Sequence, residues 1–321
     1  ANPGGRAVKL ALCALYSPGC IARYFLAALR DTDHAIVTVG PAFGSYIPWI
    51  SGGMFLPDKY AIRVDFPCEQ GRVPSGDVVR NMTGADLVIS IDAGLFMQKA
   101  DVVIATDPHV FTYESERASC KYFFNMQRAY SRPGDYWLPY AYNVKDHYPV
   151  NVSKLYDVAC IGLPYNERLE FCRRAKEAGY SVADGIGYGP DEYREIYGAS
   201  KVSFIHSSQK DTIARVFESA AMGIPFVANE TPDITEFFNP EEHFLMYESG
   251  DIDHAFELFQ SLMIHQEAGE QMAIKAQGVV TDKHTYHQRV NDILYVLATG
   301  IDSDTFNAKT LVRVNEERDA N

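Results

Sequence analysis

Residues 211–238 place charged, small and apolar side chains in an order that suits a ligand site. Arg215 and Glu218 lie three positions apart, so on a helix they would share one face. A carboxylate offers two acceptor oxygens for neighbouring ribose hydroxyls, and a guanidinium offers a fork of donors for a diphosphate. The alternative is an ordinary Arg–Glu pair on an exposed helix, which contributes little to stability.

The loop before this helix is rich in polar groups. Ser207, Lys210, Asp211 and Thr212 follow a strand that is expected to end at His206. Their hydroxyl, ammonium and carboxylate groups could line a diphosphate or a base. Each of them could equally be ordinary loop polarity, because loops run over the surface of a protein.

A second set of reactive residues follows strands in the first half of the chain. Asp107 and His109 come after a buried strand expected at 102–106, and Asp92 comes after one expected at 87–91. Asp107 could accept a proton from a hydroxyl, or hold His109 in one tautomer. The alternative is a helix cap, which is a common role for aspartate.

The elements that must position these residues alternate along the chain. Short, continuous apolar runs, typical of strands buried on both faces of a parallel sheet, are followed by amphipathic stretches typical of helices. This alternation predicts an α/β fold with doubly wound sheets. Two further expectations are a short third strand at 60–64 and a polar, partly mobile tail at 302–321.

The length of 321 residues is enough for two such domains. Segment 141–155 lacks periodicity and contains Pro149, so it is interpreted as the linker. It separates an N-terminal domain, 1–140, from a C-terminal domain, 156–285. The final helix and tail, 286–321, are expected to cross back to the N-terminal domain. Open α/β sheets bind ligands at the carboxyl ends of their strands, which predicts a site in the cleft between the domains.

The segment 211–238 resembles the C-terminal domain of GT-B glycosyltransferases, in which the pattern R-x-F-E-x-x-x-x-G-x-P-x-V-x-x-x-x-P-x-x-x-x-F-F recurs. It looks closest to the family related to the spore-maturation protein CgeB and its phage and bacterial relatives. Further stretches that resemble that family follow one another in the same order, at 106–109, 137–141, 156–168 and 284–286.

The resemblance implies two Rossmann-like domains that face a central cleft. It implies a hexosyl- or pentosyltransferase that moves a sugar from a UDP- or GDP-sugar to an acceptor hydroxyl. The reaction would be retaining and metal-independent, with the nucleotide sugar as co-substrate and no tightly bound cofactor. The donor would contact Glu218, Arg215, Gly162, Arg168, Ser207, Lys210, Asp211 and Thr212. The N-terminal domain would supply Asp107 and His109 as catalytic residues, with Ser17, Gly19 and Asp92 on the acceptor side.

Two glycines take their proposed roles from this resemblance. Gly162 follows the first strand of the C-terminal domain, and its backbone donors would lie near the donor phosphates, consistent with anion binding at a helix N-terminus. Arg168, in the first turn of that helix, could add a charge contact, or it could be a solvated arginine in an ordinary turn. Ser17 and Gly19 follow the first strand, where GT-B enzymes often place a glycine-rich loop.

One position departs from the family pattern. Many retaining enzymes of this fold carry two glutamates separated by seven residues, but this spacing places Lys210 before Glu218, and the nearest acid is Asp211. The role of a first acid and the orientation of the donor sugar therefore stay open. Two alternatives follow: a non-catalytic protein of this fold that binds a nucleotide sugar or docks a partner, and a nucleotide-sugar epimerase.

Charge disfavours nucleic acid as the acceptor. The net charge is −13, with 42 acidic and 29 basic residues, whereas proteins that bind phosphate backbones usually present a basic face. A hydroxylated DNA base stays an alternative to a glycan or a protein, because Lys121, Arg128 and Arg132 lie among the aromatic residues 122–124 and Tyr130. The same cluster could be an ordinary edge strand.

Cysteine usage and hydropathy predict a cytoplasmic protein. The 6 cysteines form no C-x-x-C pair, and no apolar run reaches the roughly 20 residues of a membrane span. A metal site is not expected, because there is no H-E-x-x-H or Cys/His ligand cluster. The nearest D-x-D motif, Asp31 to Asp33, falls between a helix and a strand, where a turn requires such residues.

Overall fold

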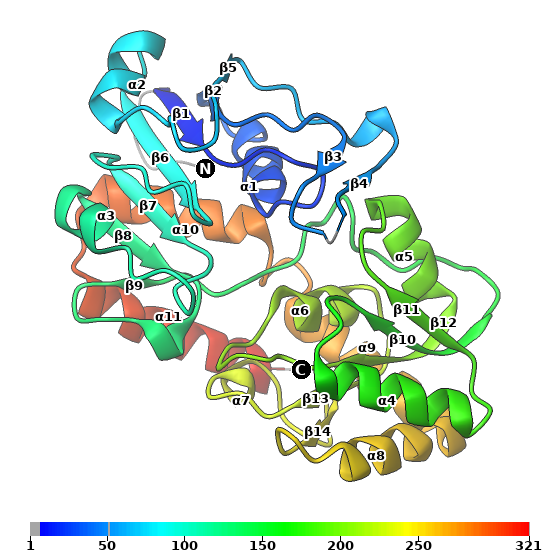
Figure 1. Cartoon of the computed structure of the whole chain (residues 1–321). Helices are drawn as coiled ribbons and strands as arrows, with labels where there is room; N and C mark the ends of the chain where they lie inside the picture. Colours follow the sequence, from blue (N-terminus) through cyan, green and yellow to red (C-terminus); the bar gives the residue numbers. More distant parts are fainter. Residues whose placement is uncertain (1–6, 51, 321) are drawn as a thin grey trace. The chain divides into compact units, whose positions relative to one another are not determined.

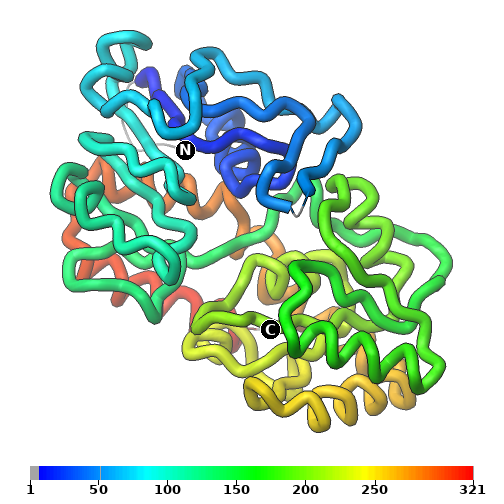
Figure 2. Tube along the Cα trace, viewed as in Figure 1, coloured from blue at the N-terminus to red at the C-terminus, as the bar shows by residue number. Residues whose placement is uncertain are grey.

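The computed structural model describes residues 7–50 and 52–320. The chain forms two compact units (Figures 1 and 2). The first runs to Pro139 and includes Arg289–Lys309, and the second consists of Tyr140–Gln288 and the described residues from Thr310. Residues 141–155 thus belong to the second unit, where Tyr142 forms a parallel bridge with Thr285.

In the described part of the first unit, seven parallel strands form one sheet. From edge to edge they are β5 (Phe66–Pro67), β2 (Ala35–Gly40), β1 (Lys9–Cys13), β6 (Leu87–Asp92), β7 (Val102–Ala105), β8 (Tyr122–Asn125) and β9 (Tyr136–Trp137). Residues 10–13 of β1 are apolar and buried, as expected for a strand covered on both faces. The strand order reverses between β1 and β6, so their carboxyl ends flank the position where such sheets bind ligands.

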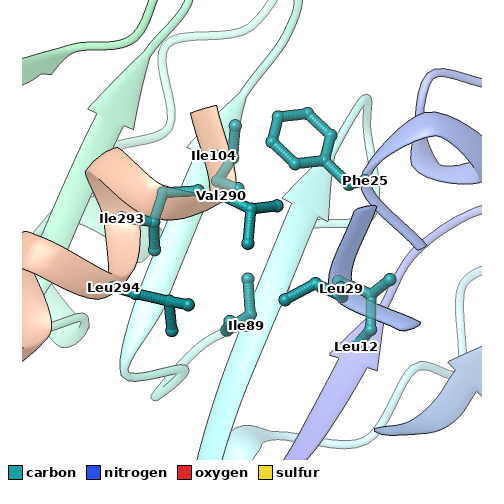
Figure 3. A pocket seen from close by; sticks show the side chains of 8 residues that line it. All are labelled: Leu12, Phe25, Leu29, Ile89, Ile104, Val290, Ile293 and Leu294. Atoms are coloured by element: carbon teal, nitrogen blue, oxygen red, sulfur yellow. The ribbon is translucent and has the colours of Figure 1, made fainter. Parts of the chain in front are cut away.

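Helix α10, which follows most of the second unit in the sequence, completes the core of the first unit. Figure 3 shows Val290, Ile293 and Leu294 of α10 around a small apolar cavity, opposite Ile89 and Ile104 of the sheet. The other elements of this unit are α1 (Ala22–Arg30), α2 (Gly76–Thr83), α3 (Glu114–Ser119), the turns η1 (Asp58–Tyr60) and η2 (Arg128–Tyr130), and the hairpin of β3 (Tyr46–Ile47) and β4 (Met54–Phe55); α10 spans Tyr286–Thr299. Residues far apart in sequence therefore share one core.

We expect Val290→Ile to stabilise the protein, because the added methylene would enter this cavity and both side chains are β-branched. Burying one CH₂ contributes about 0.8 kcal/mol, which corresponds to a rise of about 2–4 °C in the melting temperature. The control is Val279→Ile, at a buried valine of the second unit that does not line the cavity, where overpacking should lower the melting temperature. A melting temperature of Val290→Ile below that of wild type would contradict this expectation.

The second unit has a smaller sheet of the same kind. Its described residues form five parallel strands in the order β11 (Val182–Gly185), β10 (Tyr156–Ile161), β12 (Ser200–Ile205), β13 (Phe226–Asn229) and β14 (Leu245–Tyr247). Successive side chains of β10 point to opposite faces: Val158 joins one core with Phe171, and Ala159 joins another with Tyr197. The order reverses between β10 and β12, so the carboxyl ends of these strands flank the expected ligand position.

The helices of the second unit cover both faces of this sheet. Phe171 of α4 stacks on Phe204 of β12 with ring centroids 3.7 Å apart, and the ring centroid of Phe259 of α8 lies 5.6 Å from that of Phe171 in the same core. The helices are α4 (Asn166–Glu177), α5 (Pro190–Gly198), α6 (Ala214–Ala221), α7 (Ile234–Phe237), α8 (Ile252–Ile264), α9 (Gln266–Val280) and the last part of α11 (Ser303–Asp319).

The C-terminal tail is not mobile as predicted, because most of it forms α11. Phe306, Thr310 and Val314 are buried at a spacing of four residues, and Arg318 donates a 2.6 Å hydrogen bond to the carbonyl of Thr235. Three buried side chains are enough to dock an otherwise polar helix, and a local count of apolar residues does not detect them.

The strand predicted at 60–64 is also wrong. Residue 60 ends a 3₁₀ turn, and the strand beside β2 begins only at Phe66, opposite Val39. Before that point, the carboxylate of Asp65 accepts a 2.9 Å hydrogen bond from the N–H of Thr38. A side chain thus occupies the place where a backbone ladder partner was expected.

Candidate functional site

The predicted acceptor-side residues lie at the carboxyl ends of β1 and β6. Ser17 is buried, and its hydroxyl has no hydrogen-bond partner among the described residues; Gly19 is exposed. Asp92 is also buried, and its carboxylate accepts hydrogen bonds from the N–H groups of Gly94 at 2.9 Å and Leu95 at 2.7 Å. Burial raises the pKa of Asp92 against the effect of these bonds. Asp92 therefore holds its own loop at the end of β6.

Asp107 and His109 follow β7 at the same edge of the sheet and are half-buried. The hydroxyl of Thr106 donates to Asp107 at 2.7 Å, and α3 begins only at Glu114, so Asp107 does not cap a helix. The tautomer of His109 is set by Gln127 and not by Asp107, because His109 Nδ1 lies 2.9 Å from Gln127 Oε1. Gln127 was not identified from the sequence, since it lies 18 positions away.

The orientation of Gln127 decides which nitrogen of His109 carries the proton. Its Nε2 donates a 3.2 Å hydrogen bond to the carbonyl of Thr106, which turns Oε1 toward the imidazole. An amide oxygen only accepts, so Nδ1 of His109 is the donor and Nε2 carries the lone pair. His109 is therefore arranged as a proton acceptor at Nε2.

Three of the four rings in the aromatic and basic cluster of residues 121–132 are not available for stacking, and the fourth, Tyr130, is half-buried with its ring centroid 6.1 Å from that of His109. Tyr122, Phe123 and Phe124 are buried within the sheet. The cations near them are engaged locally: Arg128 lies 4.9 Å from the ring centroid of Trp137, and Arg132 pairs with Glu114 at 2.7 Å, while Lys121 lies over Tyr122. The prediction of an edge strand is wrong, because β8 pairs with β7 on one side and with β9 on the other. The buried rings nevertheless do not suit a DNA-facing surface, which would need exposed rings for stacking.

In the second unit, Arg215 packs against the glycine at the end of β10. Gly162 has φ 135°, and a Cβ at this position would lie 2.8 Å from Nη2 of Arg215. The glycine thus supplies both an unusual backbone conformation and the space for a guanidinium. Arg215 is half-buried on α6, its Nε has no hydrogen-bond partner among the described residues, and no ion pair joins it to Glu218 there. The interpretation as an exposed Arg–Glu pair does not fit this arrangement.

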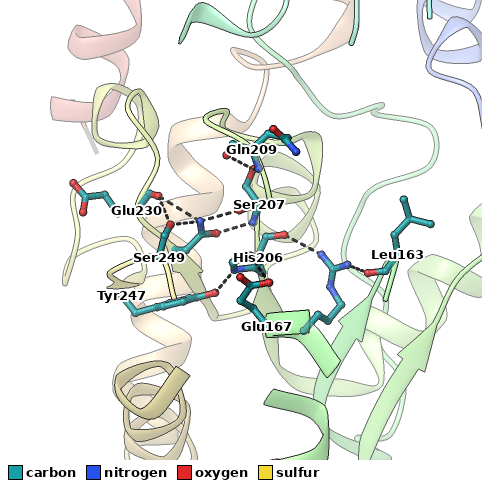
Figure 4. Close-up of polar contacts among 10 residues, drawn as sticks. Leu163, Glu167, His206, Ser207, Gln209, Glu230, Tyr247 and Ser249 are labelled. Atoms are coloured by element: carbon teal, nitrogen blue, oxygen red, sulfur yellow. Dashed lines mark hydrogen bonds and ion pairs between the residues drawn. The ribbon is translucent and has the colours of Figure 1, made fainter. Parts of the chain in front are cut away.

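Arg168 holds the two strand ends of the switch point together. It is only 3% exposed, and its guanidinium donates to the carbonyls of Leu163 and, at 2.9 Å, His206, which follow β10 and β12 (Figure 4). Burial, followed by repulsion from Arg215, lowers the pKa of Arg168 to about 10, so it stays cationic at neutral pH. Two guanidiniums thus share this end of the sheet. Neither forms a direct salt bridge within the described residues, although, against the effect of burial, the charge of Glu218 helps to raise the pKa of Arg215.

We expect Arg168→Met to destabilise the protein, because two buried carbonyls would lose their donor. Each loss costs about 1–3 kcal/mol, partly offset by relief of the repulsion between the two arginines. The control is Arg173→Met on the same helix, where the arginine pairs with exposed Glu170 and Glu177 and should be nearly neutral. Chemical denaturation measures both variants, and equal stabilities would contradict the bridging role.

The predicted loop residues divide into an inward and an outward group. Ser207 and Asp211 are buried and joined by a 2.8 Å hydrogen bond, and Thr212 donates at 2.6 Å to Asp233. Asn229 connects Ser207 to Ser249, both labelled in Figure 4: its side-chain oxygen accepts from the N–H of Ser207 at 2.7 Å, and its Nδ2 donates to the hydroxyl of Ser249 at 2.8 Å. Lys210, in contrast, is exposed. The inward group fixes the loop, and Lys210 presents its charge to solvent.

Glu218 is contacted by two residues that the sequence did not indicate. Its side chain is buried on α6, and the hydroxyl of Tyr193 on α5 donates to Oε2 at 2.7 Å. His147 Nε2 lies 3.7 Å from Oε1. His147 falls in the segment that was interpreted as a linker, and Tyr193 lies 25 positions from Glu218, so neither carried a local signal.

The described residues contain no group of three His, Cys, Asp or Glu side chains placed to hold a metal ion. Within the same residues, none of the helices combines the length and apolar character that crossing a bilayer requires.

Comparison with known proteins finds both a sequence family and solved structures that resemble this chain. The family model described as "Glycosyl transferase-like" matches residues 150–295, which contain Gly162, Arg168, Arg215 and Glu218. The fold is shared with solved GT-B structures. Residues 150–295 are thus glycosyltransferase-like, and the chain has the GT-B fold. No curated protein matches its sequence.

Three solved structures illustrate the shared fold. Sucrose-phosphate synthase from Thermosynechococcus elongatus is 13% identical with a TM-score of 0.60, over 92% of this chain and 100% of that chain. HepE of Anabaena, in complex with UDP and glucose, is 11% identical with a TM-score of 0.63, over 92% and 100%. An alpha-glucosyltransferase in complex with UDP and a 13-mer DNA containing a HMU base is 10% identical with a TM-score of 0.61, over 92% and 100%.

The structural matches confirm the predicted α/β class and the GT-B fold. The family match supports the predicted transferase. The finer relationship to the CgeB family and the roles of single residues stay predictions.

Proposed function

We propose that this chain is a glycosyltransferase that moves a sugar from a UDP- or GDP-sugar to an acceptor hydroxyl. The observation that carries the donor assignment is Arg215, which packs on Gly162 at the switch point of the second unit and forms no direct salt bridge among the described residues. Arg168 adds a second buried charge, so an anion of the size of a diphosphate would be attracted to this position. The N–H groups that precede α4 would contribute further donors.

The first unit would bind the acceptor. His109, with its lone pair at Nε2, would take the proton from the attacking hydroxyl, and Gln127 would keep the ring oriented through Nδ1. Asp107 follows the same strand, and Thr106 holds its carboxylate there. Ser17, whose buried hydroxyl is unpartnered among the described residues, and the loop held by Asp92 would complete the acceptor side.

Several finer points belong to the same proposal. We infer a retaining, metal-independent reaction in which arginines and helix N-termini stabilise the leaving diphosphate. In this proposal the nucleotide sugar is the co-substrate. The enzyme would be related to the CgeB family and would act in the cytoplasm. A glycan or protein acceptor is favoured over DNA by the net charge of −13 and by the buried rings of residues 122–124.

A thermal-shift screen of the wild type against UDP-, GDP- and TDP-sugars tests this function. We expect at least one UDP- or GDP-sugar to raise the melting temperature, because ligands that bind only the folded state stabilise it. Release of free sugar from that donor, with transfer when glycans or proteins are added, would distinguish a transferase from a non-catalytic binder. Conversion of the donor sugar into its epimer without an acceptor would favour an epimerase. The absence of any stabilisation would contradict the proposal.

A further inference from the structure

The carboxylate of Glu218 has one protein donor directed at each of its oxygens. The hydroxyl of Tyr193 donates to Oε2 at 2.7 Å, and Nε2 of His147 lies 3.7 Å from Oε1. Tyr193 and His147 also pack against each other, with ring centroids 5.9 Å apart at an interplanar angle of 70°. Three separate segments of the second unit therefore meet at one carboxylate.

Both contacts come from neutral groups that act as donors. The N–H of Asn143 donates a 3.1 Å hydrogen bond to Nδ1 of His147, so Nδ1 is an acceptor and the proton of the neutral ring sits on Nε2, toward Glu218. Burial, followed by the charge of Glu218, raises the pKa of Tyr193 well above its ordinary value, so its hydroxyl keeps its proton. The two groups thus hold the carboxylate of Glu218 in place as neutral neighbours, and the nearby charge of Arg215 acts on it without a direct ion pair among the described residues.

A carboxylate has about four lone-pair sites, two on each oxygen. Tyr193 uses one site on Oε2 and His147 is directed at one on Oε1, which leaves one acceptor site on each oxygen. The Glu218 side chain keeps 10% of its surface exposed, so these sites can be reached by a small group. Two acceptor sites on neighbouring oxygens match the two donors of a vicinal diol, and the lack of either hydroxyl would leave a buried acceptor unpaired.

We propose that Tyr193 and His147 are positioning residues that orient Glu218 to read the ribose diol, so that the enzyme selects ribonucleotide over deoxyribonucleotide donors. This inference rests on the proposed function, because it requires a nucleotide at this site. Neither residue would touch the sugar that is transferred. Their effect would appear in the discrimination between nucleotides and not in the affinity for the diphosphate.

The test compares the dissociation constants of UDP with 2′-deoxy-UDP, and of GDP with 2′-deoxy-GDP, by calorimetry. We expect the wild type to bind the better ribonucleotide on the order of 10-fold or more tightly than its deoxy form, because a hydrogen bond to a charged group is lost. Tyr193→Phe and His147→Leu should each reduce this ratio at least about threefold. His147→Gln, which can place an amide N–H near the position of Nε2, should restore most of it.

The control is Tyr180→Phe, which removes a hydroxyl from a ring packed against Phe256 and Phe259, away from Glu218, and should keep the wild-type ratio. Thermal melts identify variants that fail to fold. If Tyr193→Phe does not fold, the affinity ratios of His147→Leu and His147→Gln test the inference instead. A wild type that binds both forms equally, or variants that all keep its ratio, would overturn the inference while leaving the proposed function intact. A wild type that binds neither UDP nor GDP would instead refute the proposed function, and the inference with it.

Discussion

Arg215→Met is expected to weaken UDP binding about 30-fold or more while leaving uridine binding nearly unchanged. Removing one partner of a buried charge-assisted contact costs about 2–5 kcal/mol, and uridine carries no phosphate for the guanidinium to contact. The structure supports this difference because Arg215 lies on Gly162 at the switch point and forms no direct salt bridge among the described residues. Calorimetric titration with UDP and with uridine measures both affinities.

Two variants make the Arg215 result specific. Arg173→Met removes the same formal charge from an exposed position on α4 and should bind UDP like the wild type. Arg215→Lys keeps the charge but loses the forked donors, so we expect an intermediate affinity. A parallel loss of UDP and uridine affinity in Arg215→Met would indicate local unfolding or a base contact, and would contradict a diphosphate role.

His109→Ala is expected to lower the rate of donor-sugar release by about 10²–10⁴, with little change in donor affinity. The reason is the position of its proton: Gln127 holds Nδ1–H, and Nε2 is left as the base. Hydrolysis of the donor that stabilises the wild type provides the assay, since water can replace an unidentified acceptor. His254→Ala, at an exposed histidine of the second unit, is the control.

Gln127→Glu tests the same arrangement through pH. A carboxylate next to Nδ1–H would favour the imidazolium and raise the pKa of His109. The reaction needs a neutral His109, so activity falls when acidification protonates the ring. In the variant this loss of activity should begin at a higher pH than in the wild type. The acid limb of the pH–rate profile should therefore move upward. An unchanged profile would show that His109 is not the titrating base.

Much of the fold could be predicted from the sequence because it depends on local patterns. Continuous apolar runs such as residues 10–13 and 102–105 are buried on both faces of a parallel sheet, and such runs are visible without a structure. Arg215 and Glu218 could be assigned to one helix face because their spacing alone requires it. Gly162 could be placed at a strand end for the same local reason.

Other features were decided only by tertiary packing. The tail became α11 because side chains such as Phe306 and Val314 are buried and dock it, although most of its residues are polar. The sequence around Arg168 was compatible with a solvated arginine. Only the packing of β10 beside β12 buries its guanidinium between two carbonyls. Tyr193, His147 and Gln127 gain their partners from strands and helices 18 or more residues away, so no local pattern marks them.

The chain by itself therefore determined which residues could bind a nucleotide sugar and on which elements they lie. The tertiary structure decided how their protons and charges are arranged: Nε2 of His109 as an acceptor, Nε2–H of His147 as a donor, and a guanidinium at Arg215 without a direct salt bridge in the described chain. Hydrogen-bond direction depends on the group across the contact, and that group is supplied by a distant segment only when the chain has folded.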